Sequence, residues 1–174
     1  AEAIKLFRAD DARQTYVPGS DRFVVSPENA RERLSAFIGR ARRQLLIYDP
    51  KISDPALLKL LKERANAGVE VRVLGKVAGA ATGILAENYP GKRLHVRAIV
   101  QDGRKLFLGS QSLRRLELDK RREVGVIVDD KKAILAVTRV FEADWALTPT
   151  GKAVAVEAGR GARRHAARGV AAGG

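Results

Sequence analysis

The sequence predicts a single mixed α/β domain in which helices cover both faces of one β-sheet. Three observations favour this fold class. Short apolar runs of strand length alternate with amphipathic segments of helix length along the chain. One run is followed by a helix-like segment and a second run, an order that is typical of parallel strands. The 174 residues are the length of one ordinary domain, which can bury its own core.

The first strand and helix are expected after an N-terminal arm. Residues 1–21 show little periodicity, and we expect a linker or a peripheral arm there. Phe23 begins a strand, and Ser26-Pro27-Glu28 predicts a helix start with the serine as N-cap and the proline at the first helical position. We expect this helix to run to about Arg42, because one apolar stripe is formed by Leu34, Phe37, Ile38 and Ala41.

A strand, helix, strand unit follows. Gln44–Tyr48 is a short apolar run that predicts a strand covered on both faces. Asp54-Pro55 predicts a second capped helix start, and Gly68 is placed to end that helix in a left-handed conformation. Val69–Gly75 predicts the next strand, and the unit favours parallel pairing with a right-handed crossover.

The middle of the chain predicts a hairpin. Residues 76–92 contain several glycines and alanines, and we expect a short helix framed by loops. Leu94–Val100 and Arg104–Leu108 are two strands, because Asp102-Gly103 between apolar runs is a strong hairpin signal.

The last strand and helix close the expected domain. Glu123–Val128 predicts a strand, and Asp129-Asp130 caps a final helix whose apolar residues can pack on the sheet. We therefore place the domain over residues 22–146. Residues 147–174 are rich in alanine, glycine and arginine, and we expect a basic mobile tail there.

The charge of the chain indicates an anionic partner. The formal net charge is +13 and the pI is about 10.6, which favours polyanions such as nucleic acid, anionic headgroups or phosphate substrates. Residues 91–124 contain ten Lys or Arg but only four Asp or Glu. No cysteine is present, and neither the two histidines nor the carboxylates show a metal-ligand spacing, so we expect chemistry without metal or cofactor.

One motif lies in this basic stretch. It consists of His95, Arg97, Asp102, Gly109, Ser110 and Ser112. The pattern resembles the phospholipase D superfamily, whose motif is His, one residue, Lys, four residues, Asp, six residues, then Gly, Gly or Ser, one residue, and Asn. Every gap matches. Arg97 stands where the family has Lys, and Ser112 stands where it has Asn.

The resemblance implies that this domain carries half of an active site. In that family two halves, from a homodimer or from one longer chain, bring two histidines together. One histidine attacks phosphorus to form a phosphohistidine, and the other protonates the leaving oxygen. We expect His95 to be catalytic, in one of these two roles, since imidazole titrates near working pH.

The other motif residues receive supporting roles from the resemblance. Arg97, Ser110 and Ser112 are expected to bind the phosphate, with Arg97 on the same strand face as His95. Glu123 is expected to accept a hydrogen bond from the histidine and fix its tautomer. Asp102 and Gly109 are expected to be structural, because Asp-Gly is a turn signal.

The resemblance therefore implies a metal-independent phosphodiesterase or phosphatidyltransferase that acts on phospholipid-type diesters. Two alternatives stay open: a nuclease of the same superfamily, and a non-catalytic half that binds phosphate or forms a dimer. Few aromatic residues lie near the motif, which disfavours base stacking and tilts the expectation towards lipid or non-specific backbone binding. No apolar run reaches the roughly 18 residues that span a bilayer, so we expect a soluble protein, cytoplasmic or peripheral to an anionic membrane.

Overall fold

The computed structural model describes residues 1–79, 82–91 and 93–157. Within them, one seven-stranded mixed sheet has the strand order β1-β7-β6-β5-β2-β3-β4. The elements, in chain order, are α1 (Glu2–Asp11), β1 (Phe23–Ser26), α2 (Ala30–Gly39), β2 (Gln44–Ile52), α3 (Pro55–Asn66), β3 (Glu70–Val77), β4 (Ile84–Glu87), β5 (Arg97–Gln101), β6 (Lys105–Gly109), α4 (Arg115–Asp119), β7 (Glu123–Val128) and α5 (Lys131–Ala146).

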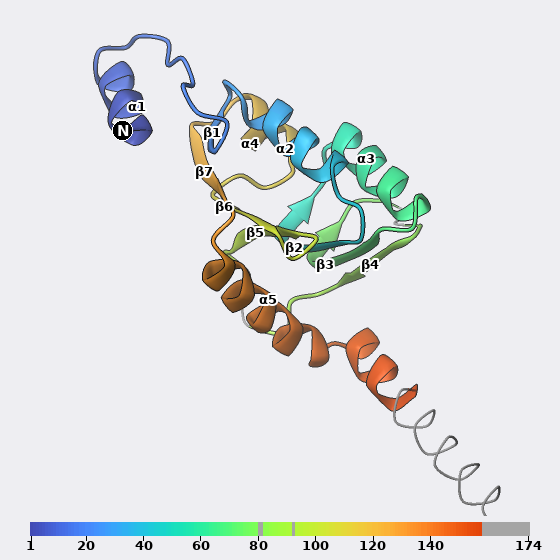
Figure 1. Ribbon diagram of the computed structural model, residues 1–174. Coiled ribbons are helices and arrows are strands. Elements are labelled where there is room, and N and C mark those ends of the chain that lie inside the picture. Colours follow the sequence, from blue (N-terminus) through green and yellow to red (C-terminus); the bar gives the residue numbers. More distant parts are fainter. Residues whose placement is uncertain (80–81, 92, 158–174) are drawn as a thin grey trace, which may run out of the picture.

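Helices cover both faces of this sheet, which confirms the expected fold class. In Figure 1, α2 and α3 lie on one face and α5 lies on the other. The larger apolar cluster fills the α2 and α3 side and includes Leu34, Ile47 and Phe107. A second cluster under α5 includes Leu106 and Trp145. Two separate apolar layers are what a sheet buried on both faces requires.

The β2–α3–β3 unit forms as the sequence predicts. β2 and β3 pair in parallel, with Leu45 opposite Val71. Asp54 caps α3, because its carboxylate accepts the backbone N–H of Leu57 at 3.0 Å. Gly68 follows the helix at φ +85°, the left-handed conformation that glycine adopts without strain.

Arg72 attaches α5 to the sheet. Its side chain is 10% exposed and pairs with the Glu142 carboxylate at 2.5 Å. Its guanidinium also lies 5.6 Å from the ring centre of Phe141 and 5.4 Å from that of Trp145. The Tyr48 hydroxyl donates to the same helix, at Asp144, over 2.5 Å. These contacts fix α5 beside the edge where the motif lies.

The predicted start of α2 was wrong. The helix begins at Ala30 with Asn29 as N-cap, and it ends at Gly39. Asn29 is bound to the preceding strand, since its side chain accepts the N–H of Val25 at 2.7 Å and donates to the carbonyl of Phe23 at 3.0 Å. Ser26 belongs to β1, where it pairs with Glu123. A long-range strand pairing therefore overrides the local cap signal.

Two other sequence predictions need correction. Residues 76–92 contain the end of β3 and the short strand β4, where a helix was expected. β4 pairs in parallel with β3, and this pairing buries Ile84. The strand expected from Leu94 begins only at Arg97, because the partner strand β6 ends at Gly109, directly opposite Arg97. His95 therefore lies in the coil before β5, and strand alternation does not place it on the face of Arg97.

The two ends of the chain extend the domain. The segment expected as an arm contains α1, whose Leu6 packs with Tyr16 and Val25. Residues 149–157 are helical, and the rest of the expected basic tail, residues 158–174, lies outside the described residues. None of the helices in the described part of the chain combines the length and the hydrophobicity that a membrane crossing requires.

Candidate phosphodiester site

The motif residues other than Asp102 gather at one edge of the sheet, at the ends of three strands and in the segments beside them. Arg97 is the first residue of β5, Gly109 is the last of β6, and the two are paired. Gly109 is also paired with Gly125 of β7, two residues after Glu123. The alternating strand directions therefore bring the start of β5, the end of β6 and the start of β7 together.

His95 is exposed and borders an apolar pocket of about 420 Å³ between this edge and α5. Its backbone carbonyl accepts a hydrogen bond from Nη1 of Arg97 at 2.8 Å. Aromatic and aliphatic side chains supply most of the pocket wall: Tyr48, Tyr89, Leu94, Val96, Ala98, Leu108, Ala136, Val137 and Val140. His95 thus lies beside both the Arg97 guanidinium and the apolar pocket, where a ligand with a charged group and an apolar group can contact both.

Arg97 and Ser112, the two departures from the family motif, contact each other. Nε of Arg97 donates to Oγ of Ser112 at 3.3 Å. Ser112 is fully buried, so its hydroxyl lies behind the guanidinium. A long, forked arginine meets a short serine here, in the place where the family motif combines a shorter cation with a longer amide. The two exchanges therefore complement each other in length.

Two buried carboxyl groups flank Ser112, and the sequence analysis missed both. Asp49, 2% exposed, accepts the N–H of Leu113 at 2.7 Å. Burial raises the pKa of the Asp49 carboxyl, and hydrogen bonds from Leu113, Lys51 and the Ser112 side chain oppose this effect. Glu117, 1% exposed, accepts the N–H of Ser112 at 2.6 Å.

These acids hold the Ser112 segment in place. Glu117 is itself paired with Arg114 at 3.3 Å and with Arg121 at 3.7 Å. Buried carboxylates that accept backbone N–H groups fix a loop strongly, because an unpaired charge there is costly. Asp49 could have been found from the sequence, because it follows an apolar run of strand length. No comparable sequence signal marks Glu117.

Ser110 and Gly109 hold the end of β6 against β7. Oγ of Ser110 accepts the N–H of Val124 at 3.1 Å, and the Ser110 N–H donates to the Val124 carbonyl at 2.9 Å. A Cβ on Gly109 would lie 2.9 Å from Cα of Gly125 and 2.5 Å from Oε1 of Gln111. Only glycine allows this approach of the two strands.

Neither Glu123 nor Asp102 contacts His95 through a hydrogen bond in the described part of the chain. Among the described residues, no hydrogen bond joins Glu123 to His95, and the ion-pair partner of Glu123 is Arg121 at 4.0 Å. Asp102 lies at the far end of the hairpin, where it accepts the backbone N–H of Gln44 at 2.9 Å. Burial acts to raise the pKa of Asp102, but N–H donors from Gln44, Arg43 and Arg42 outweigh it and lower the pKa.

The edge thus combines an exposed imidazole, a fixed guanidinium and hydroxyl groups. A nucleophile or general acid beside a cation is the arrangement that a phosphoryl group needs, because its charge spreads over several oxygens. No group of three His, Asp or Glu side chains suited to a metal ion occurs among the residues described.

Comparison with known proteins gives one family and several solved structures with a similar fold. The family model described as "Cardiolipin synthase, PLD-like domain" matches residues 34–145. Nuc from Salmonella typhimurium, a phospholipase D family member, is 19% identical over 73% of this chain and 94% of its own, with a TM-score of 0.65. NucT from Helicobacter pylori is 16% identical over 72% of this chain and 95% of its own, with a TM-score of 0.61.

A third similar structure is polyphosphate kinase from Porphyromonas gingivalis. It is 20% identical, with 81% of this chain and 24% of that chain covered and a TM-score of 0.69. The comparison with curated proteins gave no match. At these identities the structures share a fold with the chain, and the family assignment rests on the matched domain model.

Proposed function

Because the chain belongs to the phospholipase D superfamily, we propose that it is half of a metal-independent phosphodiesterase or phosphatidyltransferase acting on phospholipid-type diesters. The apolar pocket beside His95 carries this proposal. A phospholipid diester presents a charged phosphate joined to a large apolar group. Arg97 supplies the charge complement, and the pocket, with Val137 and Val140 on its α5 side, supplies the apolar one.

The residues divide the reaction between them. One histidine attacks phosphorus, and a phosphohistidine forms as the bond from phosphorus to the leaving oxygen breaks. The other histidine protonates that oxygen and then takes a proton from the water or alcohol that displaces the first histidine from phosphorus. His95 takes one of these roles and the histidine of the second half takes the other. Arg97 binds the equatorial oxygens and Ser110 donates a hydrogen bond, whereas the buried Ser112 holds the Arg97 guanidinium from behind. Glu123 orients the imidazole when substrate and the second half are bound. That half comes from a second copy or from a longer parent chain.

The test replaces an apolar wall residue. Val140→Asp puts a carboxylate into the pocket, and kcat/KM for a diester with an octyl group should fall about tenfold or more, whereas the rate on a methyl diester should change little. Leu135→Asp is the matched control, since Leu135 lies on α5, is 49% exposed and does not line the pocket. Equal losses for the two variants would argue against lipid-type substrates.

A nuclease is the second candidate, and the surplus of cations around the motif favours it. Between residues 91 and 124 there are ten Lys or Arg against four Asp or Glu. Relaxation of supercoiled plasmid in EDTA tests this candidate. If His95→Ala abolishes relaxation, and Val140→Asp leaves it unchanged, the nuclease replaces the lipid enzyme as the preferred function.

A further inference from the structure

We propose that the edge of the sheet opposite His95 binds the phosphate backbone of a nucleic acid, with one phosphate held between Arg40 and Lys105. The choice of nucleic acid over a membrane rests in one step on the proposed lipid substrate, whereas the binding itself concerns residues outside the proposed reaction. The nucleic acid would be a second anionic partner, in addition to the substrate, whether that substrate is a lipid-type diester or DNA.

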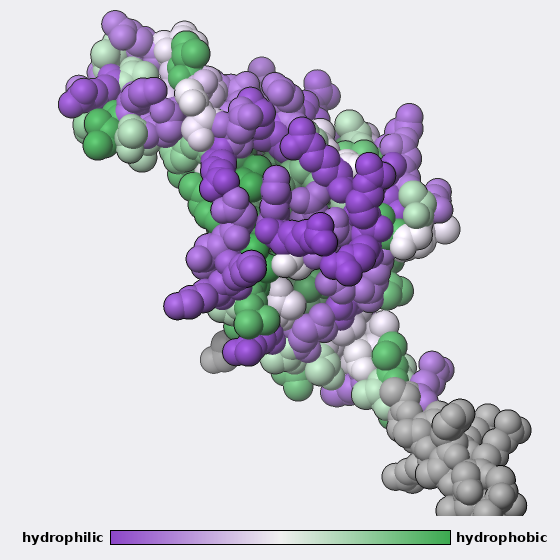
Figure 2. Space-filling view, in the orientation of Figure 1, coloured by the Kyte–Doolittle hydropathy of each residue, from purple (hydrophilic) through white to green (hydrophobic). Residues whose placement is uncertain are grey.

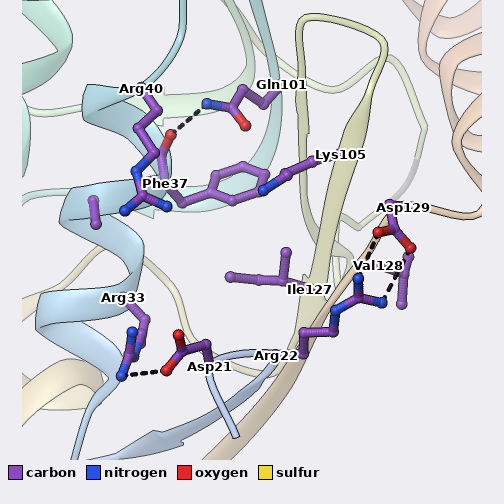
Figure 3. Close-up of a pocket in the computed structure, with 11 residues that line it drawn as sticks. Asp21, Arg22, Arg33, Phe37, Arg40, Gln101, Lys105, Ile127, Val128 and Asp129 are labelled. Atoms are coloured by element: carbon purple, nitrogen blue, oxygen red, sulfur yellow. Dashed lines mark hydrogen bonds and ion pairs between the residues drawn. The ribbon is translucent and has the colours of Figure 1, made fainter.

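A pocket of about 210 Å³ lies at this edge, between α2 and the ends of β5, β6 and β7. The buried ring of Phe37 and the side chain of Ile127 line its apolar part. Arg40 follows α2 and Lys105 begins β6, and Figure 3 shows their charged ends extending towards each other over the Phe37 ring. Two cations from different elements therefore converge on one recess.

The carboxylates of the pocket are already paired with other cations. Asp21 pairs with Arg33 at 2.6 Å. Asp129 pairs with Arg22 through two hydrogen bonds of 3.1 and 2.6 Å, which are also visible in Figure 3. In the part of the chain that the structure describes, neither Arg40 nor Lys105 has an ion pair. Their charge is available to an external anion.

Asp102 adds more cations to the same edge. Its carboxylate accepts the backbone N–H groups of Arg42 at 3.0 Å and of Arg43 at 2.8 Å. This joins the loop after α2 to the β5–β6 turn, which carries Arg104, and all three of these arginines are exposed. Figure 2 shows strongly hydrophilic residues gathered over this face. We call Arg40, Arg42, Arg43, Arg104 and Lys105 the basic edge.

Three features favour nucleic acid over a membrane. First, none of the large exposed apolar residues among those described lies in segments 36–43 or 101–105, so this edge offers nothing to insert into a bilayer. Second, four of the five cations are arginines, which bind phosphate oxygens in a bidentate manner. Third, a bilayer on this edge would leave the His95 edge facing away from its lipid.

A polynucleotide avoids the third difficulty, because it is long. β5 has five residues, and the four steps from Arg97 to Gln101 span about 13 Å at about 3.3 Å each. This is about the rise of four base pairs along the axis of B-form DNA, at about 3.4 Å each. One strand can occupy the basic edge and continue past it, and the scarcity of aromatic residues here predicts binding without sequence preference.

The test measures binding in a background without turnover. In His95→Ala protein with EDTA, the anisotropy of a labelled 20-mer DNA gives the affinity as a function of salt. The change Arg40→Gln with Lys105→Gln should weaken binding at least about tenfold near 100 mM salt, and should reduce the slope of log K against log salt by about 2. The control, Lys76→Gln with Arg139→Gln, removes one Lys and one Arg that are exposed elsewhere, and should change both quantities much less.

Three results would overturn the proposal. Equal losses in the two double variants would show that only net charge matters. Binding of inorganic phosphate without DNA would assign a small-anion site instead. Vesicles with one third phosphatidylglycerol that lose affinity on Arg40→Gln with Lys105→Gln, while DNA does not, would assign a membrane surface. Circular dichroism and the melting temperature of each variant establish that the comparison concerns folded protein.

Discussion

The contact between Arg97 and Ser112 bears directly on whether the site is active. Each exchange alone departs from the family motif, and each alone suggests a weakened phosphate site. Together they form a hydrogen bond of 3.3 Å, with the serine buried behind the guanidinium. A cation held from behind is pre-positioned for a phosphate oxygen, which favours a working site over a silenced one.

This pair should behave as a unit. Arg97→Lys removes the Nε donor, and Ser112→Asn puts a larger side chain behind an arginine, so each change should lower kcat/KM on a phosphodiester about tenfold. The double change restores the family combination and should recover most of the loss, with a coupling energy of at least about 1 kcal/mol. Additive losses would mean that the pair does not position the phosphate.

At the residue scale, sequence reasoning selected candidate groups for the chemistry and missed the buried acids that contact them. The motif spacing selected His95 and Arg97, because the number of residues between motif positions can be counted in the sequence without a structure. Glu117 escaped notice, because a charged residue in a short helix is usually exposed, and only the folded loop shows that it binds the N–H of Ser112.

At the scale of elements, Asp102 joins the β5–β6 turn to the loop between α2 and β2. The residue adopts φ +54°, a conformation that Asn and Asp tolerate better than most residues. Its carboxylate accepts backbone N–H groups from Arg42, Arg43 and Gln44. The motif aspartate thus joins two loops at the edge opposite His95.

Replacement of this carboxylate should give a pH-dependent loss of stability. Asp102→Asn keeps the backbone conformation but offers one acceptor oxygen and no charge, so it should lower the free energy of unfolding by about 1–2 kcal/mol at pH 7. The pKa of Asp102 is lowered in the folded protein. Its contribution is therefore present above the ordinary Asp value of about 3.9 and is lost as the pH falls through the lowered value.

Urea unfolding at pH 7 and at pH 3 measures this difference. The gap between wild type and Asp102→Asn should narrow at the lower pH. Asp129→Asn is the control, because Asp129 forms an exposed ion pair with Arg22 and should contribute less than about 1 kcal/mol. A gap of the same size at both pH values would mean that the carboxylate charge does not hold the loop.

Local signals predicted elements well only where a local contact decides the outcome. The Asp54 and Asp130 caps are correct, since each side chain binds an N–H three residues later. Ser26 failed as a cap because β1 pairs with β7, about a hundred residues away. β4 was missed for the same reason: four residues that pair with β3 give no periodic signal of their own.

At the scale of the whole molecule, one sheet carries the two edges for which we propose anion binding. His95 and Arg97 lie at one end of the β5–β6 hairpin, and Arg40 and Lys105 lie at the other. The net charge of +13 predicted an anionic partner, but it did not predict two separate basic regions, because a net charge does not say where the charges lie in the fold. The proposed function requires a second half, so we expect turnover per chain to depend on how the halves associate.

The most direct measurement is turnover of a chromogenic phosphodiester in excess EDTA by this chain and by His95→Ala at matched concentrations. Asn88→Ala, an exposed change in a nearby loop, serves as the control. We expect turnover that survives chelation, is kept by Asn88→Ala and is lost in His95→Ala. Equal turnover in wild type and His95→Ala would contradict it, and diester binding without turnover in either protein would assign a non-catalytic half.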